Sequence, residues 1–181
     1  MAENDNTIRP KNKRLLRIIV PIIIVIIAAG IWTVKNTRDK DEALENDGSD
    51  FALHVTSNLD LEKLKSYGLP IIIDFGADSC IPCKEMAPVL IELNAQLRGK
   101  AIIKFVDVWK YPGLAEGYPL TVIPTQVFIA ADGKPYTPED PQTAQMKLYA
   151  MKDSGEHVFT THEGGLTKEA LLKIIGEMEA K

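Results

Sequence analysis

Apolar residues recur along the chain in spacings that predict alternating strands and helices. Continuous apolar runs, and shorter runs next to turn signals, predict five strands, over residues 71–77, 101–108, 125–130, 146–151 and 158–162. Apolar positions three or four residues apart, together with start and stop signals, predict four helices, over residues 59–67, 81–97, 112–117 and 168–179. Ser57 or Asn58 is expected to cap the first of them. Elements in this order, closed by a hairpin and a helix, predict an α/β sandwich.

A proline-containing stretch separates the third predicted strand from the fourth. Residues 131–145 hold Pro135, Pro138 and Pro141, and a turn signal follows at residues 152–155. We interpret 131–145 as a loop insertion that interrupts a hairpin. The alternative is a disordered loop of no consequence.

The N-terminal part of the chain follows a different pattern. Residues 1–17 form a basic tail, and residues 18–34 contain no charged side chain. An uncharged apolar stretch of this length predicts one transmembrane helix, since a span needs about 17–25 apolar residues. Residues 35–50 are polar and rich in charge, which is typical of a linker. The folded domain is therefore expected over residues 51–181.

The charges around the apolar stretch predict its orientation. Because basic residues stay on the cytoplasmic side, the tail is expected inside and the domain outside, as a single-pass protein of the cytoplasmic membrane with its domain in the periplasm or on the outer face. A cleaved signal peptide is the first alternative, with small residues near 28–30, although the apolar run continues through Ile31 and Trp32. A buried core helix is the second alternative, which the basic flank disfavours.

Charge and cysteine content exclude several classes of protein. The formal net charge is −4, and five basic against two acidic residues give residues 1–34 a charge of +3, so that residues 35–181 carry −7. An acidic domain does not predict nucleic-acid binding, which needs clustered Lys and Arg. The chain has only two cysteines, Cys80 and Cys83. This number predicts neither a disulfide framework nor a four-thiolate zinc site.

The two cysteines stand between a predicted buried strand and the start of a predicted helix. Free N–H groups and the helix dipole favour a thiolate there, so the pKa of Cys80 is expected to lie below its usual value of about 8.5. Cys83 lies one turn later and is expected to point inward, where it would resolve a mixed disulfide. The alternatives are a pair of buried structural thiols or half of a metal site.

Asp74 interrupts the apolar strand that precedes the cysteines. An unpaired carboxylate is costly in such a strand, so burial is expected to raise the pKa of Asp74. The tight loop after the strand would bring its side chain beneath the cysteine pair, where it would exchange a proton with Cys83. The alternative is an exposed Asp on an edge strand, which the neighbouring isoleucines disfavour.

These residues resemble the thioredoxin-fold proteins over roughly residues 51–181. Four strings carry the resemblance, in the family's order of strand, redox pair, proline-containing helix and cis-proline loop: Ile73-Asp74-Phe75-Gly76-Ala77, Cys80-x-Pro82-Cys83-Lys84, Ala87-Pro88 and Ile123-Pro124-Thr125. The resemblance implies a three-layer sandwich with a mixed central sheet. It also implies a redox-active Cys80–Cys83 disulfide and no further cofactor.

The resemblance further implies a site for substrate. Pro124 is expected to be cis and adjacent to the redox pair, and Ile123 to offer backbone groups to an extended peptide, with Pro82 on the same surface. The chain departs from the family at Ser79, where a Trp is usual, and at Ile81, where a Gly is usual. The family's lysine partner of the buried Asp is also missing, because Lys104 is displaced along its strand.

Together these features predict a membrane-anchored, extracytoplasmic thiol–disulfide oxidoreductase. Pro82, rather than His, before the second cysteine favours a reductase of protein disulfides. The implied electron donor is a transmembrane thiol carrier, and the implied acceptors are misbridged exported proteins or apocytochrome c. The alternative is a copper-delivery or interaction module on the same fold, which would use both cysteines and a histidine. His54, His157 and His162 are otherwise expected to be surface or satisfied histidines.

Overall fold

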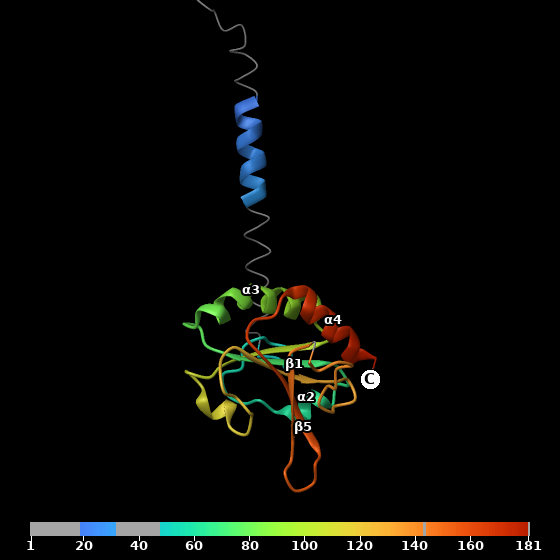
Figure 1. Ribbon diagram of the computed structural model, residues 1–181. Coiled ribbons are helices and arrows are strands. Elements are labelled where there is room, and N and C mark those ends of the chain that lie inside the picture. The colour runs from blue at the N-terminus through green and yellow to red at the C-terminus, as the bar shows by residue number, and fades with distance from the viewer. Residues whose placement is uncertain (1–18, 32–47, 143, 181) are drawn as a thin grey trace, which may run out of the picture. The chain divides into compact units, whose positions relative to one another are not determined.

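The computed structural model describes residues 19–31, 48–142 and 144–180. The chain divides into two compact units, Met1–Lys40 and Asp41–Lys181. In the first unit, residues 19–31 form a helix, drawn in blue in Figure 1. None of the helices within the described ranges is both long enough and apolar enough to cross a membrane.

Several predictions for the N-terminal part fall on residues outside the described ranges. These are the basic tail over 1–17, both ends of the span predicted over 18–34, and most of the linker predicted over 35–50.

A five-stranded mixed sheet forms the centre of the second unit. Its strands are β1 (Ile71–Gly76), β2 (Ile102–Asp107), β3 (Thr125–Ile129), β4 (Met146–Ala150) and β5 (His157–Glu163). They lie in the order β2-β1-β3-β5-β4, with β1 and β2 parallel and the other neighbours antiparallel. This arrangement confirms the mixed α/β sheet that the sequence predicted.

Helices cover both faces of this sheet and give three layers (Figure 1). On one face, α3 (Ile81–Gln96) and α4 (Lys168–Glu179) pack their buried apolar side chains against alternate residues of the strands. On the other face lie α2 (Leu61–Lys65) and the 3-10 helix η1 (Pro112–Ala115). Because β1 lies inside the sheet and both its faces are covered, all six of its residues are buried, including Asp74.

The first helix of the domain is shorter than the pattern predicted. The expected helix over 59–67, capped by Ser57 or Asn58, is α2, which begins after Asp60. The Asp60 side chain accepts a hydrogen bond from the backbone N–H of Lys63, so the carboxylate provides the N-cap.

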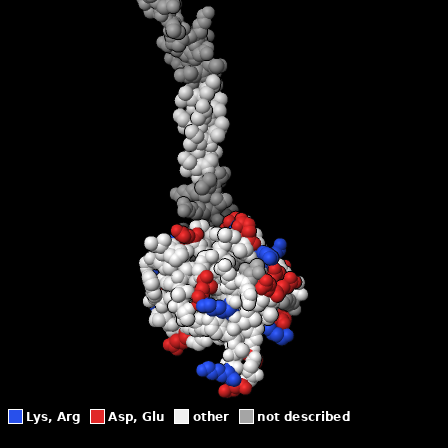
Figure 2. All heavy atoms as spheres, viewed as in Figure 1, with Lys and Arg blue, Asp and Glu red and all other residues white. Residues whose placement is uncertain are grey.

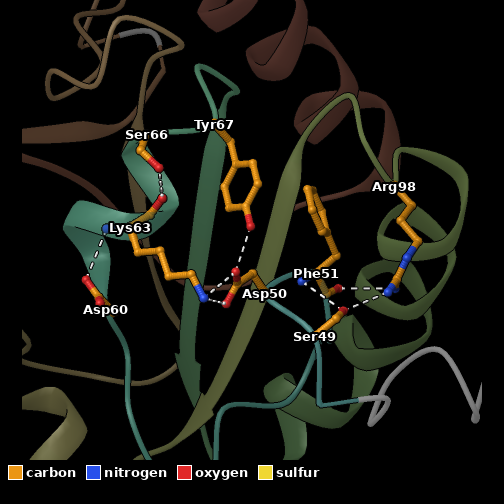
Figure 3. A network of polar contacts seen from close by, with 8 residues as sticks. All are labelled: Ser49, Asp50, Phe51, Asp60, Lys63, Ser66, Tyr67 and Arg98. Carbon is orange, nitrogen blue, oxygen red and sulfur yellow. Dashed lines mark hydrogen bonds and ion pairs between the residues drawn. The ribbon is translucent and has the colours of Figure 1, made fainter.

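A polar network attaches the start of the domain to its helices (Figure 3). Asp50 accepts hydrogen bonds from Lys63 Nζ at 3.0 Å and Tyr67 Oη at 2.6 Å, and these bonds hold the pKa of Asp50 below its usual range. Arg98, just beyond α3, donates to the Ser49 hydroxyl at 2.7 Å and lies over the ring of Phe51.

The stretch predicted as a loop insertion contains a deeply buried aromatic side chain. Tyr136 is 1% exposed, and its hydroxyl donates to Glu177 of α4. Its carbonyl accepts a hydrogen bond from the hydroxyl of Thr160 in β5. The described part of this stretch is thus packed onto both β5 and α4.

Candidate active site at the start of α3

Cys80 and Cys83 form a disulfide at the first turn of α3, with their Cα atoms 5.3 Å apart. Cys80 is the N-cap residue of the helix, and Pro82 occupies its first turn. No acidic side chain lies in that turn, so nothing there offsets the positive end of the helix dipole. Cys80 is 9% exposed and Cys83 is 3% exposed, which makes Cys80 the more exposed residue of the pair.

Asp74 lies on β1 beneath this pair and is fully buried. Burial raises the pKa of Asp74 to about 7, and a hydrogen bond from Gln126 acts in the opposite direction. Gln126 Nε2 donates to Asp74 Oδ1 at 2.8 Å, whereas Oδ2 has no hydrogen-bond partner among the described residues. A carboxyl with this pKa holds or releases a proton near neutral pH.

Gly76 separates the Asp74 carboxyl from Cys83. A Cβ atom at Gly76 would lie 3.2 Å from Cys83 Sγ and 3.4 Å from Asp74 Oδ2, so both atoms border the space that this glycine leaves open. The same Cβ would lie 2.9 Å from the ring of Phe105, which is closer than packing allows. A side chain at this position would therefore come between the carboxyl and the sulfur.

A row of polar side chains continues from Asp74 across the sheet. In the strand register Asp74 pairs with Gln126 of β3, and Gln126 pairs with His162 of β5. Gln126 Oε1 lies 3.1 Å from His162 Nδ1. His162 is 7% exposed, and burial lowers its pKa. The expectation of a satisfied histidine agrees with this contact.

The loop before β3 lies directly beside Cys80. The Ile123–Pro124 peptide bond is cis, as the family resemblance implied. Cys80 Sγ lies 4.0 Å from the carbonyl oxygen of Ile123, and the Ile123 side chain packs against the cysteine pair. Ile81, which follows Cys80 in the chain, and Val122, which precedes Ile123, are exposed apolar residues. The structure thus places Ile123 in contact with the cysteine pair, with Pro124 next to it in the chain and Pro82 in the first turn of α3.

Asp107 connects the loop before the cysteines to the end of β2. Its Oδ2 accepts from the backbone N–H of Asp78, and its Oδ1 accepts from those of Trp109 and Lys110, each at 3.0 Å. Burial opposes ionisation of this carboxyl, but these bonds outweigh it and lower the pKa of Asp107. A carboxylate with three backbone donors fixes the loop from which Cys80 projects.

A pocket of about 100 Å³ opens beside Cys83. Its walls include Ala77, Lys84, Phe105 and His54, whose ring contacts that of Phe105 edge to face. Among the described residues, no three His, Cys, Asp or Glu side chains come together as a metal site.

Lys104 does not reach Asp74. It pairs in register with Ile73, so its side chain lies on the opposite face of the sheet from Asp74, and its ammonium donates to the carbonyl of Ala52 at 2.6 Å. The displacement seen in the sequence thus removes the lysine from the site, where Gln126 contacts Asp74 instead.

A comparison of the sequence with models of protein families agrees with the fold and with the cysteine site described above. A family model described as Thioredoxin matches residues 54–154, which is more than half of the chain. The chain belongs to the thioredoxin family.

Thioredoxins of plants and bacteria are among its relatives. Thioredoxin Y1 of the chloroplast, from Arabidopsis thaliana, is 33% identical over 86 residues, which are 47% of this chain and 49% of that protein. Thioredoxin of Staphylococcus aureus strain Mu50 is 45% identical over 64 residues, which are 35% of this chain and 61% of that protein. The chain thus spans between about half and two thirds of the length of these curated relatives.

The crystal structure of chloroplastic thioredoxin z resembles the fold of this chain. The TM-score is 0.50 at 23% sequence identity, and the match covers 71% of this chain and 95% of that one. At this identity the likeness supports the thioredoxin fold.

The sequence did not single out Gln126, His162 or Asp107 as parts of this site. Gln126 could have been noticed, because it is a polar residue two places after Pro124, at an inward position of a predicted strand. His162 and Asp107 have no such local signal, because their contacts with the site depend on strand register and loop conformation.

Proposed function

We propose that this protein is a membrane-anchored, extracytoplasmic thiol–disulfide oxidoreductase that reduces protein disulfides. One observation carries the proposed activity: a Cys80–Cys83 disulfide at the start of α3 lies next to a buried carboxyl, Asp74, whose pKa is raised to about 7. A thiol pair of this kind needs a nucleophile, a resolving thiol and a proton acceptor, and these three residues supply them.

The reaction proceeds in two exchanges. In the reduced protein the Cys80 thiolate attacks one sulfur of a substrate disulfide, which forms a mixed disulfide and releases the first substrate thiolate. Cys83 then gives its proton to the Asp74 carboxylate, and the Cys83 thiolate attacks the Cys80 sulfur. The Cys80–substrate bond breaks, the second substrate thiolate leaves, and the Cys80–Cys83 disulfide is restored with two electrons passed to the substrate.

An extended peptide fits the surface beside Cys80. The Ile123 carbonyl lies near the Cys80 sulfur, and the exposed side chains of Ile81 and Val122 flank it. A backbone acceptor between apolar side chains favours an extended substrate segment with apolar residues around its cysteine. Misbridged exported proteins and apocytochrome c remain the expected acceptors.

Location and electron supply follow from the N-terminal sequence. The basic tail over 1–17 and the uncharged stretch over 18–34 favour an anchor with the domain outside the cytoplasm. A reductase there requires a dedicated donor, for which a transmembrane thiol carrier is the proposed source. Two electrons and two protons from the carrier's dithiol would return Cys80 and Cys83 to the reduced state.

Reduction of insulin disulfides by the full chain in detergent, with dithiothreitol as the electron source, tests the activity. We expect turnover by the wild type and none by Cys80→Ser. Cys83→Ser should instead accumulate mixed disulfides, because the first exchange proceeds without a resolving thiol. Ser154→Ala, in an exposed turn, is the control and should behave as the wild type.

Three results would contradict the proposal, in whole or in part. Full activity of Cys80→Ser would exclude Cys80 as the nucleophile. Stoichiometric copper binding by the reduced wild type, without disulfide exchange, would support the metal-delivery alternative. A reduction potential less reducing than that of the glutathione couple would retain the activity but reverse its direction.

A further inference from the structure

Asp74, Gln126 and His162 form a row of polar side chains across the sheet, which we call the polar row. It crosses three adjacent strands on the face that α3 and α4 cover, and all three side chains are buried. Phe105 pairs with Asp74 at one end of the row, and Met146 pairs with His162 at the other, so apolar residues enclose it. A buried amide in such a row must satisfy both its donor and its acceptor ends.

Met86 of α3 contributes to the orientation of the Gln126 amide. Gln126 Nε2 lies 2.8 Å from Asp74 Oδ1 and 3.5 Å from Met86 Sδ. An NH₂ group has two donors, and the carboxyl and the thioether are two acceptors. With the amide reversed, Oε1 would face both acceptors, and the thioether would gain no hydrogen bond. The contacts therefore favour Nε2 toward Asp74.

His162 holds the other end of the amide. With Nε2 toward Asp74, Gln126 Oε1 faces His162 Nδ1 at 3.1 Å and accepts a hydrogen bond from it. The ring makes this bond through a proton on Nδ1, which the charged ring always carries and the neutral ring carries in one of its two tautomers, and a backbone hydrogen bond with Gly164 also contacts the ring. The orientation of Gln126 is thus the same in both protonation states of His162.

The row fixes which oxygen of Asp74 carries the proton. Because Oδ1 accepts from Gln126, the carboxyl proton resides on Oδ2, the atom that borders the space at Gly76 opposite Cys83 Sγ. We propose that Gln126 and His162 are positioning residues that direct the Asp74 proton toward Cys83. This inference rests on the proposed function for its catalytic consequence, although the orientation itself does not depend on activity.

The proton transfer balances within the resolving step. The Cys83 thiol gives its proton to Asp74 Oδ2, directly or through one water, and the electron pair left on sulfur forms the bond to Cys80 while the Cys80–substrate bond breaks and its electron pair leaves with the substrate thiolate. When a donor dithiol reduces the pair again, Oδ2 returns the proton to Cys83. A reversed Gln126 amide would bind the proton on Oδ1, on the side away from the cysteine.

Few other described titratable groups face the Asp74 carboxyl. Cys83 faces it from α3, and His162 faces it through Gln126 from β5. From β2 the neighbour is Phe105, while Lys104 lies on the opposite face of the sheet. His54 and Lys84 line the pocket beyond Phe105 and Cys83. A titration of Asp74 in the disulfide form therefore reports on the row without interference from thiols.

The test is a ¹³C NMR titration of the Asp74 carboxyl in the full chain, oxidised and in detergent. Gln126→Leu removes the donor and should raise the pKa of Asp74 by about one pH unit. His162→Phe should raise it as well, because the amide is no longer held. His162→Asn keeps an N–H near the position of Nδ1 and should restore the wild-type titration. His157→Phe, the same change on the same strand but outside the row, is the control.

A second measurement links the orientation to chemistry. Resolution of a preformed mixed disulfide on Cys80 should slow roughly tenfold or more in Gln126→Leu and His162→Phe at neutral pH. An unchanged Asp74 titration in His162→Phe, or the same shift in His162→Asn, would overturn the positioning role of His162. Absence of disulfide exchange in the wild type would instead contradict the proposed function, and the titration would still decide the orientation.

Discussion

Asp74 Oδ2 and Cys83 Sγ border the same small space, which stays open because residue 76 is a glycine. The carboxyl is fully buried, and its pKa is raised to about 7 because burial disfavours the charged form. A proton acceptor that titrates near neutrality thus lies next to the shielded cysteine rather than the accessible one. This placement favours a role for Asp74 in the second exchange, where Cys83 must lose its proton.

Replacing Asp74 with Asn should stabilise the protein in a pH-dependent way. In the unfolded chain the carboxyl loses its proton near pH 4, but in the folded protein it keeps the proton until about pH 7. The free energy of unfolding of the wild type therefore falls as the pH rises through this window and levels off above it. Asp74→Asn removes this loss, on the order of 4 kcal/mol at most.

Urea unfolding at pH 4 and pH 8 measures this difference. The difference in the free energy of unfolding between Asp74→Asn and the wild type should be larger at pH 8 than at pH 4. Turnover at neutral pH should fall, because Cys83 loses its proton acceptor. The same stability difference at both pH values would show that the Asp74 carboxyl titrates normally.

The sequence predicted the elements well because their signals are local. The apolar run of β1 and the cysteines at the start of α3 can be read without knowing what they contact. Asp74 was identified for the same reason, since a carboxylate in an apolar strand is costly wherever the strand lies. The sequence therefore predicted the order of the elements and three central residues of the candidate site, Asp74, Cys80 and Cys83.

The polar row could not be predicted in this way. Gln126 and His162 are 36 residues apart, and the stretch around Tyr136 separates their strands. Their contact depends on the antiparallel register of β3 and β5, and a shift of one residue would turn His162 to the other face.

The N-cap of α2 was predicted at the wrong residue for a different reason. Ser57, Asn58 and Asp60 all have side chains that can cap a helix, and the sequence does not show which of them does so.

Gly76→Ala should destabilise the domain and slow the resolving exchange. The new Cβ would lie 2.9 Å from the Phe105 ring and 3.2 Å from Cys83 Sγ, so buried groups must move. Overpacking of this kind costs roughly 1–3 kcal/mol. Unfolding in urea and the lifetime of a mixed disulfide on Cys80 measure the two effects.

Gly176→Ala is the matched control for this change. A Cβ at Gly176, in α4, would meet no atom within 4 Å apart from its chain neighbours and the nearby backbone of its own helix. Alanine should therefore stabilise the helix, by about 0.5–1 kcal/mol. Equal changes in the free energy of unfolding for Gly76→Ala and Gly176→Ala would show that the space at Gly76 can take a methyl group without strain.

Asp107→Asn should loosen the loop that precedes Cys80. The amide retains one acceptor oxygen for Trp109 and Lys110, but its NH₂ group would face the backbone N–H of Asp78. We expect a loss of about 1–3 kcal/mol in the free energy of unfolding at pH 7. Because the pKa of Asp107 is lowered in the folded state, this stabilisation is present above the unfolded pKa and is lost as the pH falls through the folded value.

Unfolding midpoints at pH 7 and at acidic pH check this prediction. Asp132→Asn is the control, because Asp132 also accepts a backbone hydrogen bond, from Lys134, but in the turn that follows β3. A smaller loss in the free energy of unfolding for Asp107→Asn than for Asp132→Asn would contradict the proposal that Asp107 holds the cysteine loop in place.

The last prediction concerns the side of the membrane on which the domain acts. A cytoplasmic thiol pair would be kept reduced by the glutathione and thioredoxin pools, whereas an exported pair meets oxidised partners and needs its own donor. Arg9, Arg14 and Arg17 belong to the basic tail that should hold the N-terminus inside. A reporter that is active only outside the cytoplasm, fused after Lys181, should therefore be active.

Replacing the basic residues of the tail with Gln is the matched variant, and it should reduce the reporter signal because the orientation signal is lost. The intact chain should also remain in the membrane fraction after a high-salt wash, since screening of charge does not release about 17 buried apolar residues. Recovery of a soluble, shortened protein that begins near Ile31 would show a cleaved signal peptide instead. A silent reporter together with a cytoplasmic, salt-released protein would exclude export and place the thiol pair among the cytoplasmic reductants.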